Sequence, residues 1–386
     1  MVDRSASRPR NRGRRPAPIG VQARMPEFER ARLSVDEAED SLVATAARLA
    51  IPVLDRPKAD FEILAISGGA AGGAFGAGVL VGLTRAGKRP KFAIVTGVST
   101  GALMAPFAFL GSDWDERLTD AYVGGHAARL WSLTRFAPTL DGGLFRPDAL
   151  DSLINPFVDA DLVAAVAREH ALGRRLLVAT TDLDSEKACI WDMGEIASRG
   201  GEPALALFRK VLAASASLPG LFPPRRIECE AEGLTYEEMH VDGGVAAPLF
   251  VMPEALLRWK DLGLRLQHSR IYVIANISLE QIPRTTEPNI VAILSRSFDT
   301  MLRSSYRQAL SVVTTFCADH DLPLSVASIP AVPDSGSMLS FDTTVMRRIF
   351  DDAVARAQEP DFWHTPRSPR SPGPSDSLRP PPTATE

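Results

Sequence analysis

Short apolar runs and longer stretches with helical spacing alternate along the chain, between two polar ends. The short runs are bounded by glycine, proline or charged residues and predict buried strands. They are 61–67, 91–96, 175–181, 188–193, 270–277 and 324–329. Helices are predicted at 34–49, 73–86, 100–110, 161–171, 202–214, 253–262 and 289–318. This alternation favours an α/β fold, in which helices cover both faces of a mostly parallel sheet.

The longest predicted helix, 289–318, carries an apolar stripe. Apolar side chains recur at helical spacing at Ile290, Ile293, Leu294, Met301, Leu302, Leu310 and Val313. Three arginines lie largely on other faces: Arg296, Arg303 and Arg307. Such a stripe is typical of a helix that packs on a core. We therefore expect core contact along the stripe rather than a lipid-binding surface.

Two charge-free stretches, Ile63–Leu83 and Phe92–Gly111, are about long enough to span a bilayer. A membrane hairpin is therefore an alternative interpretation. The first stretch contains seven glycines, however, which weaken a helix and insert poorly into lipid. Each stretch also divides naturally into a strand, a glycine turn and a helix. We favour that interpretation.

The composition is that of a protein with one large core. Of 386 residues, 45% are hydrophobic and 23% are charged, with a net charge of −4. We expect no nucleic-acid partner, because this charge offers no basic footprint. A basic, proline-rich tail is predicted at 1–27 and a Pro/Ser-rich tail at 365–386, both disordered, on either side of one domain at 28–364.

The three cysteines, Cys189, Cys229 and Cys317, are widely spaced and form neither a disulfide framework nor a CxxC pair. No apolar segment follows the basic first residues, so we expect no signal peptide. We therefore predict a cytoplasmic location with reduced thiols, including peripheral contact with a membrane surface. The sequence does not indicate an oligomeric state.

A possible nucleophile stands in Gly97-Val98-Ser99-Thr100-Gly101, which matches the G-x-S-x-G pattern. The pattern alone is weak, but here it lies between a predicted strand and a predicted helix. Ser99 on such a turn would expose its hydroxyl at a helix N-terminus, where the dipole favours developing negative charge. The alternative is an ordinary N-cap serine.

A second glycine-rich turn, 67–73 (SGGAAGG), follows the first predicted strand. Its backbone N–H groups could bind an anion. A phosphate-binding loop is disfavoured, because no G-x-x-x-x-G-K-[ST] pattern or lysine is present. An oxyanion hole, which needs only N–H donors, fits better beside G-x-S-x-G.

The third motif, Asp242-Gly243-Gly244, places a carboxylate on a tight turn at the end of an apolar run. Standing alone, it could be a plain Asp-Gly turn. The three motifs occur in the order glycine loop, G-x-S-x-G and D-G-G.

In that order the motifs resemble the patatin-like phospholipase family. Six segments carry the resemblance, which covers about 61–329: LAISGGAAGGAFGAGVL, TGVSTGAL, GGLFRPDAL, LLVATTDLDS, ASASLPGLFPP and HVDGG. The resemblance implies a three-layer α/β/α fold with a mostly parallel central sheet. It also implies a hydrolase acting on a lipid or simple ester. We expect no cofactor and no metal, because the six histidines are scattered without HxxxH or HExxH spacing and no calcium loop is visible.

The resemblance also assigns roles to residues. Ser99 would be the nucleophile and Asp242 the general base of a Ser–Asp dyad. The amides of Gly68, Gly69 and Ala70 would form the oxyanion hole, and 213–224 would wall the site. A carboxylate kept dry against the serine becomes a stronger base than it is in water.

Two residues depart from the family pattern. Ala70 stands where the family has a third glycine, and Gly72 stands where it has a basic residue. Ala70 can still donate its amide if its φ is negative. The missing charge at Gly72 leaves a neutral lipid or simple ester open as the substrate.

Two alternatives remain. An α/β-hydrolase would use a histidine in a triad, and the downstream candidates are His240, His268, His320 and His364. A carboxylate base would keep its activity below pH 6, whereas an imidazole loses it near its usual pKa of about 6.5. The other alternative is an inactive lipid-binding or interaction protein of the same fold, against which the intact Ser99 and Asp242 argue.

Overall fold

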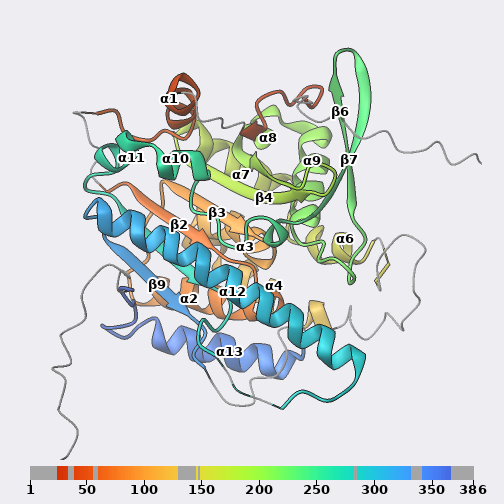
Figure 1. The fold of residues 1–386 in the computed structure, drawn as a ribbon, viewed down its shortest axis with the longest axis vertical. Coiled ribbons are helices and arrows are strands. Elements are labelled where there is room, and N and C mark those ends of the chain that lie inside the picture. The colour runs from red at the N-terminus through yellow and green to blue at the C-terminus, as the bar shows by residue number, and fades with distance from the viewer. Residues whose placement is uncertain are drawn as a thin grey trace, which may run out of the picture.

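A mixed, mostly parallel sheet forms the centre of the molecule (Figure 1). The computed structural model describes residues 24–33, 39–54, 60–128, 145–146, 148–281, 283, 285–331 and 341–366. Within them the sheet has nine strands, with main order β1-β5-β4-β3-β2-β8-β9. The strands are β1 (Arg32–Leu33), β2 (Glu62–Ile66), β3 (Ile94–Val98), β4 (Arg175–Asp182), β5 (Lys187–Asp192), β6 (Arg225–Ala231), β7 (Leu234–Asp242), β8 (Arg270–Ala275) and β9 (Leu324–Ser328).

Helices cover both faces of this sheet, because the side chains of its buried strands alternate between two apolar cores. Leu64 and Ile66 of β2 belong to one core, and Ile63 and Ala65 to the other. The first core includes α2 (Gly73–Arg85), α3 (Thr100–Leu110), α7 (Ala160–Ala171), α9 (Gly201–Ser215) and α13 (Thr343–Arg356). The second includes α1 (Glu39–Arg48), α10 (Glu254–Arg258), α11 (Lys260–Arg265) and α12 (Ile290–Asp319). The predicted three-layer α/β/α fold is confirmed.

Sheet register brings the ends of β3 and β7 together. On one edge, β4 pairs in parallel with β3 up to Val98↔Ala179. One residue further along β4, the partner changes to antiparallel β7, with Thr180↔Asp242. The other edge of β4 pairs with β5 over this stretch. Asp242 therefore lies directly beyond the end of β3, where Ser99 begins the next turn.

Most predicted elements are present with small shifts of their ends. The third predicted helix matches α3, and the last predicted strand matches β9 within one residue. Two predictions need correction, and one feature was missed. The strand placed at 91–96 begins at Ile94 and continues through Gly97 to Val98. The helix placed at 253–262 is two short helices, α10 and α11, which meet at Trp259.

The missed feature is the β6–β7 hairpin, which was not predicted and projects from the body of the molecule (Figure 1). Smaller helices also went unpredicted: α4 (Asp115–Val123), α6 (Ala149–Ile154) and α8 (Met193–Arg199). Part of the first predicted helix, 34–38, lies outside the described residues, as do 142–144 and 147 of the GGLFRPDAL segment.

The apolar stripe of α12 is only partly in the core. Val313 is buried, and Leu302 and Leu310 pack against the second core. In contrast, four members of the stripe are exposed: Ile290, Ile293, Leu294 and Met301. The prediction of core contact is therefore wrong for the N-terminal half of the stripe. The helical period places side chains on a face, but it does not tell whether the rest of the protein reaches that face.

Each of the two charge-free stretches folds as a strand, a turn and a helix. The alternative interpretation, a membrane hairpin made of two spanning helices, is therefore wrong. Ile63–Leu83 contains most of β2 and α2, and Phe92–Gly111 contains β3 and α3. No helix in the described segments is both long enough and apolar enough to cross a bilayer.

The ends of the domain are only partly described. Arg24 exchanges two backbone hydrogen bonds with Glu230 of β6, and Met25 packs against the first core. His364 likewise pairs with Val326 of β9. Residues 1–23 and 367–386 of the predicted tails lie outside the described residues, so the boundaries at 27 and 365 stay predictions.

Candidate active site

Ser99 occupies a strained turn between β3 and α3. Its φ is 55° and its ψ is −127°, a combination that residues with a Cβ rarely adopt. Such a residue costs on the order of 1–3 kcal/mol and is found mainly at functional sites. The turn needs glycine at Gly101, where a Cβ would lie 2.4 Å from the Ile66 carbonyl oxygen. A Cβ at Gly97 would likewise lie only 2.6 Å from the Gly101 carbonyl oxygen. Gly101 therefore allows α3 to approach β2 closely, and Gly97 allows it to approach β3.

Asp242 ends β7 and points at Ser99. The Ser99 hydroxyl donates to Asp242 Oδ2 at 2.5 Å, and the Gly244 amide donates to Oδ1 at 2.7 Å. Gly243 lets the turn pass β4, since a Cβ there would lie 2.2 Å from the Ala179 carbonyl oxygen. Burial raises the pKa of Asp242 to about 6, although the hydrogen bonds from Ser99 and Gly244 act in the opposite direction. The carboxylate is thus a stronger base than a solvated aspartate.

The segment 213–224 holds both residues in place. Ser215 Oγ accepts from the Ser99 amide at 3.0 Å and donates to the Ala179 carbonyl at 2.7 Å. The Ser217 carbonyl accepts from the Asp242 amide at 2.9 Å. The sequence predicts this segment as a wall of the site but does not identify its two serines as anchors. The repeated small polar residues in ASASLPG are the signal that could have indicated them.

The glycine-rich turn follows β2 and lies against Ser99. A Cβ at Gly68 would be 3.0 Å from the Ser99 Cβ, so only glycine fits at this contact. Among the described residues, the Gly69 and Ala70 amides donate no hydrogen bond to other protein groups. These amides are therefore available to a ligand. Ala70 has φ 49°, so the condition of a negative φ is not met, although its amide still donates to no protein group among the described residues. Its left-handed backbone explains the glycine preferred there, because a Cβ costs roughly 1 kcal/mol in that region.

Asn276, which follows β8, anchors this turn and was not predicted. Its side chain accepts from the Gly76 amide at 3.0 Å and donates to the Ser67 carbonyl at 2.8 Å. The turn packs so closely that a Cβ at Gly72 would lie 2.1 Å from the Asn276 carbonyl oxygen. No side chain fits at position 72 in this arrangement, which accounts for the missing basic residue.

We expect Asn276→Ala to lower the free energy of unfolding by about 2 kcal/mol, because it leaves two buried backbone groups without partners. The ester-hydrolysis rate should also fall several-fold, since the turn loses its anchor. Urea unfolding and kcat/KM would measure the two effects, with exposed Asn155→Ala as the matched control. Equal stability of the two variants would contradict the anchoring role.

Tyr306 of α12 is a further residue at the site. A Cβ at Gly68 would lie 2.6 Å from the Tyr306 hydroxyl, and one at Gly244 would lie 3.9 Å from it. Burial and the nearby charge of Asp242 raise the pKa of this hydroxyl, although hydrogen bonding from the Gly68 backbone acts the other way. The hydroxyl therefore stays protonated. Nothing in the local sequence marks Tyr306, because only the packing of α12 brings it here.

Residues 64–254, which contain the glycine turn, Ser99 and Asp242, match the model of one protein family, the patatin-like phospholipases. This stretch is a patatin-like phospholipase domain. No protein among curated sequences matches the chain. Among solved structures, the chain is similar to VipD from Legionella pneumophila, with 12% identity and a TM-score of 0.36 over 78% of this chain and 67% of that one.

All six histidines lie within the described residues. None of them, inside or outside the patatin-like domain, hydrogen-bonds to Ser99. His240 is fully buried, and its ring contacts Glu238 at 3.0 Å and Thr180 at 2.9 Å. The His320 ring lies against Phe316 with the ring planes tilted by 55°, and the His364 backbone pairs with β9. The geometry therefore offers no histidine as a base for Ser99.

One group of potential metal ligands lies in the patatin-like domain, at His170, Asp192 and Glu195. Their ligand atoms are already engaged by other groups. Asp192 Oδ1 accepts from the Gly194 and Glu195 amides, and Glu195 Oε1 pairs with Arg30 at 3.2 Å. Burial lowers the pKa of the His170 imidazole, and the positive charge of Arg175, 3.4 Å from His170 Nδ1, lowers it further. This cluster fits a helix cap with neutralised charges better than a metal site.

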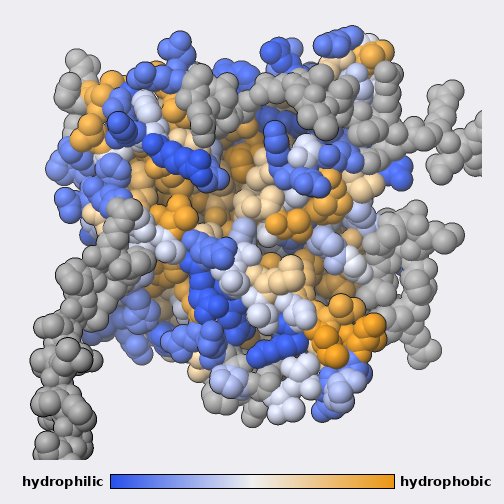
Figure 2. Space-filling model, viewed as in Figure 1, coloured by the Kyte–Doolittle hydropathy of each residue, from blue (hydrophilic) through white to orange (hydrophobic). Residues whose placement is uncertain are grey.

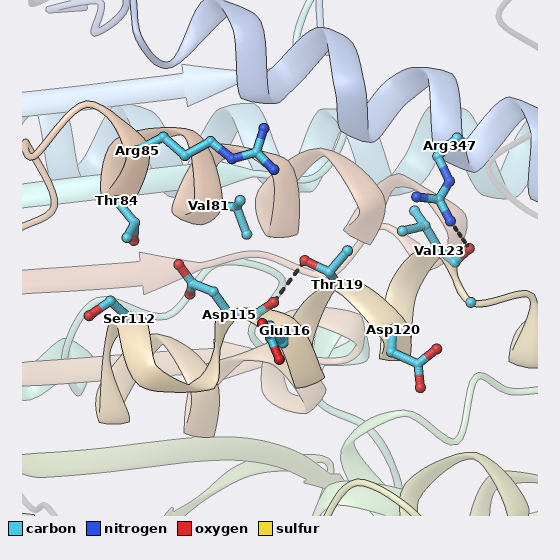
Figure 3. A pocket seen from close by; sticks show the side chains of 11 residues that line it. Val81, Thr84, Arg85, Ser112, Asp115, Glu116, Thr119, Asp120, Val123 and Arg347 are labelled. Atoms are coloured by element: carbon cyan, nitrogen blue, oxygen red, sulfur yellow. Dashed lines mark hydrogen bonds between the residues drawn. The ribbon is translucent and has the colours of Figure 1, made fainter.

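A cavity of about 540 Å³ lies between α2 and α4 of the domain (Figure 3). Its lining includes the carboxylates Glu116 and Asp120 and the cations Arg85 and Arg347. None of the predicted site residues lines it. Arg347 donates to the Val123 carbonyl at 2.8 Å, so this cation holds the end of α4.

Proposed function

We propose that the chain is a lipid acyl hydrolase, which cleaves carboxylic esters through an acyl-enzyme on Ser99 with Asp242 as the general base. The match to the patatin-like phospholipases supports lipid acyl hydrolysis in general. The observation that carries the finer proposal is the 2.5 Å hydrogen bond from the strained Ser99 to the buried Asp242 carboxylate. Geometry of this kind pairs a nucleophile with its base.

In the proposed reaction, Ser99 Oγ attacks the ester carbonyl carbon while Asp242 Oδ2 takes the hydroxyl proton. The amides of Gly69 and Ala70, joined by the Gly68 amide once it leaves the Tyr306 hydroxyl, stabilise the negative oxygen of the tetrahedral intermediate. The intermediate collapses, and the proton passes from Asp242 to the leaving alkoxide, which departs as an alcohol. A water molecule then gives a proton to Asp242 and attacks the acyl carbon. As the bond from this carbon to Ser99 Oγ breaks, Asp242 returns the proton to Ser99 Oγ, and the acid is released.

The rival proposals have less support. A Ser–His–Asp triad requires a histidine within hydrogen-bond reach of Ser99, and none of the six histidines hydrogen-bonds to Ser99. An inactive lipid-binding protein would have no reason to keep both Ser99 and Asp242 in this geometry. We also propose one hydrolase domain at 28–364 and a cytoplasmic location, which the three free thiols of Cys189, Cys229 and Cys317 favour.

A fluorophosphonate probe tests the proposal directly, because it labels only activated serines. The full chain should be labelled and should hydrolyse esters in a panel of phospholipids, monoglycerides and p-nitrophenyl esters. Lipid binding with neither labelling nor hydrolysis would favour the inactive protein instead.

The pKa of Asp242 sets the expected pH dependence. The base must be ionised to take the proton from Ser99, and its pKa is about 6. The value of kcat/KM for a neutral ester should therefore be level above pH 7 and fall about tenfold per unit well below pH 6. Full activity at pH 4.5 would contradict a buried carboxylate base. Because this pKa is close to that of an imidazole, a pH profile does not distinguish the dyad from a triad.

A further inference from the structure

The outer face of α12 exposes apolar side chains that the core does not cover. Ile290 is 73% exposed, Leu294 63% and Met301 68%. Ile293 and Val312 are exposed beside them. Figure 2 shows a hydrophobic cluster at the lower right, where the N-terminal end of α12 lies in Figure 1. Large apolar side chains gathered on one helix face typically mark a binding surface.

Three arginines lie on another side of α12, next to one edge of this apolar face. Arg296, Arg303 and Arg307 line a cavity of about 260 Å³ between α12 and the segment before it, together with Thr300 and Gln281. The single acidic residue in this lining, Asp299, is itself buried. Guanidinium groups bind phosphate oxygens through paired N–H donors. Arg303 already donates to the Glu280 carbonyl at 3.0 Å, so a phosphate group in this cavity would share the guanidinium groups with protein partners.

The charge of this surface is opposite to that of the chain. From Ile290 to Arg307 the sequence carries three arginines and one aspartate, whereas the whole chain has a net charge of −4. A helix with an apolar face and a basic border is typical of proteins that lie on anionic membranes. The charge is thus complementary to an anionic phospholipid surface.

The inner face of the same helix reaches the active site. Tyr306 lies beside Gly68 and Gly244, and Arg303 and Arg307 are one turn or less away from it along α12. Val245, which follows the Asp242 turn directly, is 51% exposed. A membrane in contact with α12 would therefore be close to the nucleophile. It would also offer a phosphate site in place of the basic residue that Gly72 has replaced.

We propose that the outer face of α12 docks on an anionic phospholipid surface. Ile290, Leu294 and Met301 enter the acyl boundary, and the cavity lined by Arg296, Arg303 and Arg307 holds a lipid phosphate. This proposal rests on the lipid hydrolase function proposed above, because it explains how that site meets its substrate.

The test is co-sedimentation of the full chain with vesicles of ether-linked phospholipids, which the enzyme cannot hydrolyse. Vesicles of phosphatidylcholine alone are compared with vesicles that also contain phosphatidylglycerol. We expect tighter binding to the anionic vesicles. Leu294→Ser should weaken it about tenfold, because a leucine leaves the acyl boundary. Arg307→Gln should weaken it about fivefold.

Matched controls separate this surface from general effects of charge and hydrophobicity. Leu172 is 69% exposed on another element, and Arg348 is exposed on α13. Leu172→Ser and Arg348→Gln should bind anionic vesicles as the wild-type protein does. The melting temperature of each variant would show that it has folded.

Equal binding of the α12 variants and the wild-type protein would overturn the proposal. So would size-exclusion chromatography that showed loss of a dimer in Leu294→Ser without a change in vesicle binding, because a second copy would then cover α12. Weaker vesicle binding of the α12 variants, in a protein that no fluorophosphonate labels, would support docking and refute the hydrolase. Hydrolysis of soluble esters, together with unchanged vesicle binding of the α12 variants, would support the hydrolase and refute docking through α12.

Discussion

We expect Ser99→Ala to lose nearly all ester hydrolysis, by about 10³-fold or more. The hydroxyl that donates to Asp242 at 2.5 Å is removed, and no other described serine or threonine hydroxyl donates to this carboxylate side chain. The residual rate would come from the glycine turn and from substrate binding alone. Measurement of kcat/KM on a p-nitrophenyl ester, with fluorophosphonate labelling in parallel, checks the result.

Two further variants make the Ser99 result specific. Exposed Ser112→Ala is the matched control and should retain full activity. Ser99→Gly should be as inactive as Ser99→Ala but about 1 kcal/mol more stable, because glycine relieves the positive φ of the turn. Activity of Ser99→Ala within tenfold of the wild-type protein would exclude Ser99 as the nucleophile.

The sequence predicts the local parts of this site well. Each motif lies on a turn next to a short apolar run or a stretch with helical spacing. The strand, turn and helix around Ser99 can therefore be predicted from the sequence alone. The end of α3 and the start of β4 follow directly from these patterns. The order of the motifs then suggests the family, which the match at 64–254 confirms.

The parts that depend on tertiary contacts were not predicted. The β6–β7 hairpin does have a local signal that was overlooked, because buried Ile227 and Cys229 alternate with exposed glutamates, which is the period of a half-buried strand. Asn276 and Tyr306 carry no local signature, because their roles come from packing against the glycine turn. The exposure of Leu294 was not predicted either, because helical spacing shows which face of α12 carries Leu294 but not whether other elements cover that face.

The most informative prediction concerns Asp242→Asn. Asparagine can keep the hydrogen bond from the Gly244 amide, so the turn should retain its shape. It cannot accept the Ser99 proton, so activity should fall nearly as far as in Ser99→Ala. The double variant should be little worse than either single one, because the two residues act as a unit.

The stability of Asp242→Asn should change in the opposite direction to its activity. The pKa of Asp242 is raised to about 6 by burial, so its ionisation costs folding free energy as the pH rises from about 4 through 6. Asparagine carries no charge, and at pH 7 the variant should be more stable by on the order of 2 kcal/mol. A loss of activity with a gain in stability cannot be attributed to unfolding.

The histidine variants complete this experiment. His240, His268 and His320, replaced one at a time by asparagine or glutamine, should each lose less than about tenfold in kcat/KM, because none contacts Ser99. His240 is the most demanding of them, since its buried ring bridges Glu238 and Thr180, and its replacement should lower stability before activity. An inactive but folded histidine variant, together with an active Asp242→Asn, would replace the dyad with a triad.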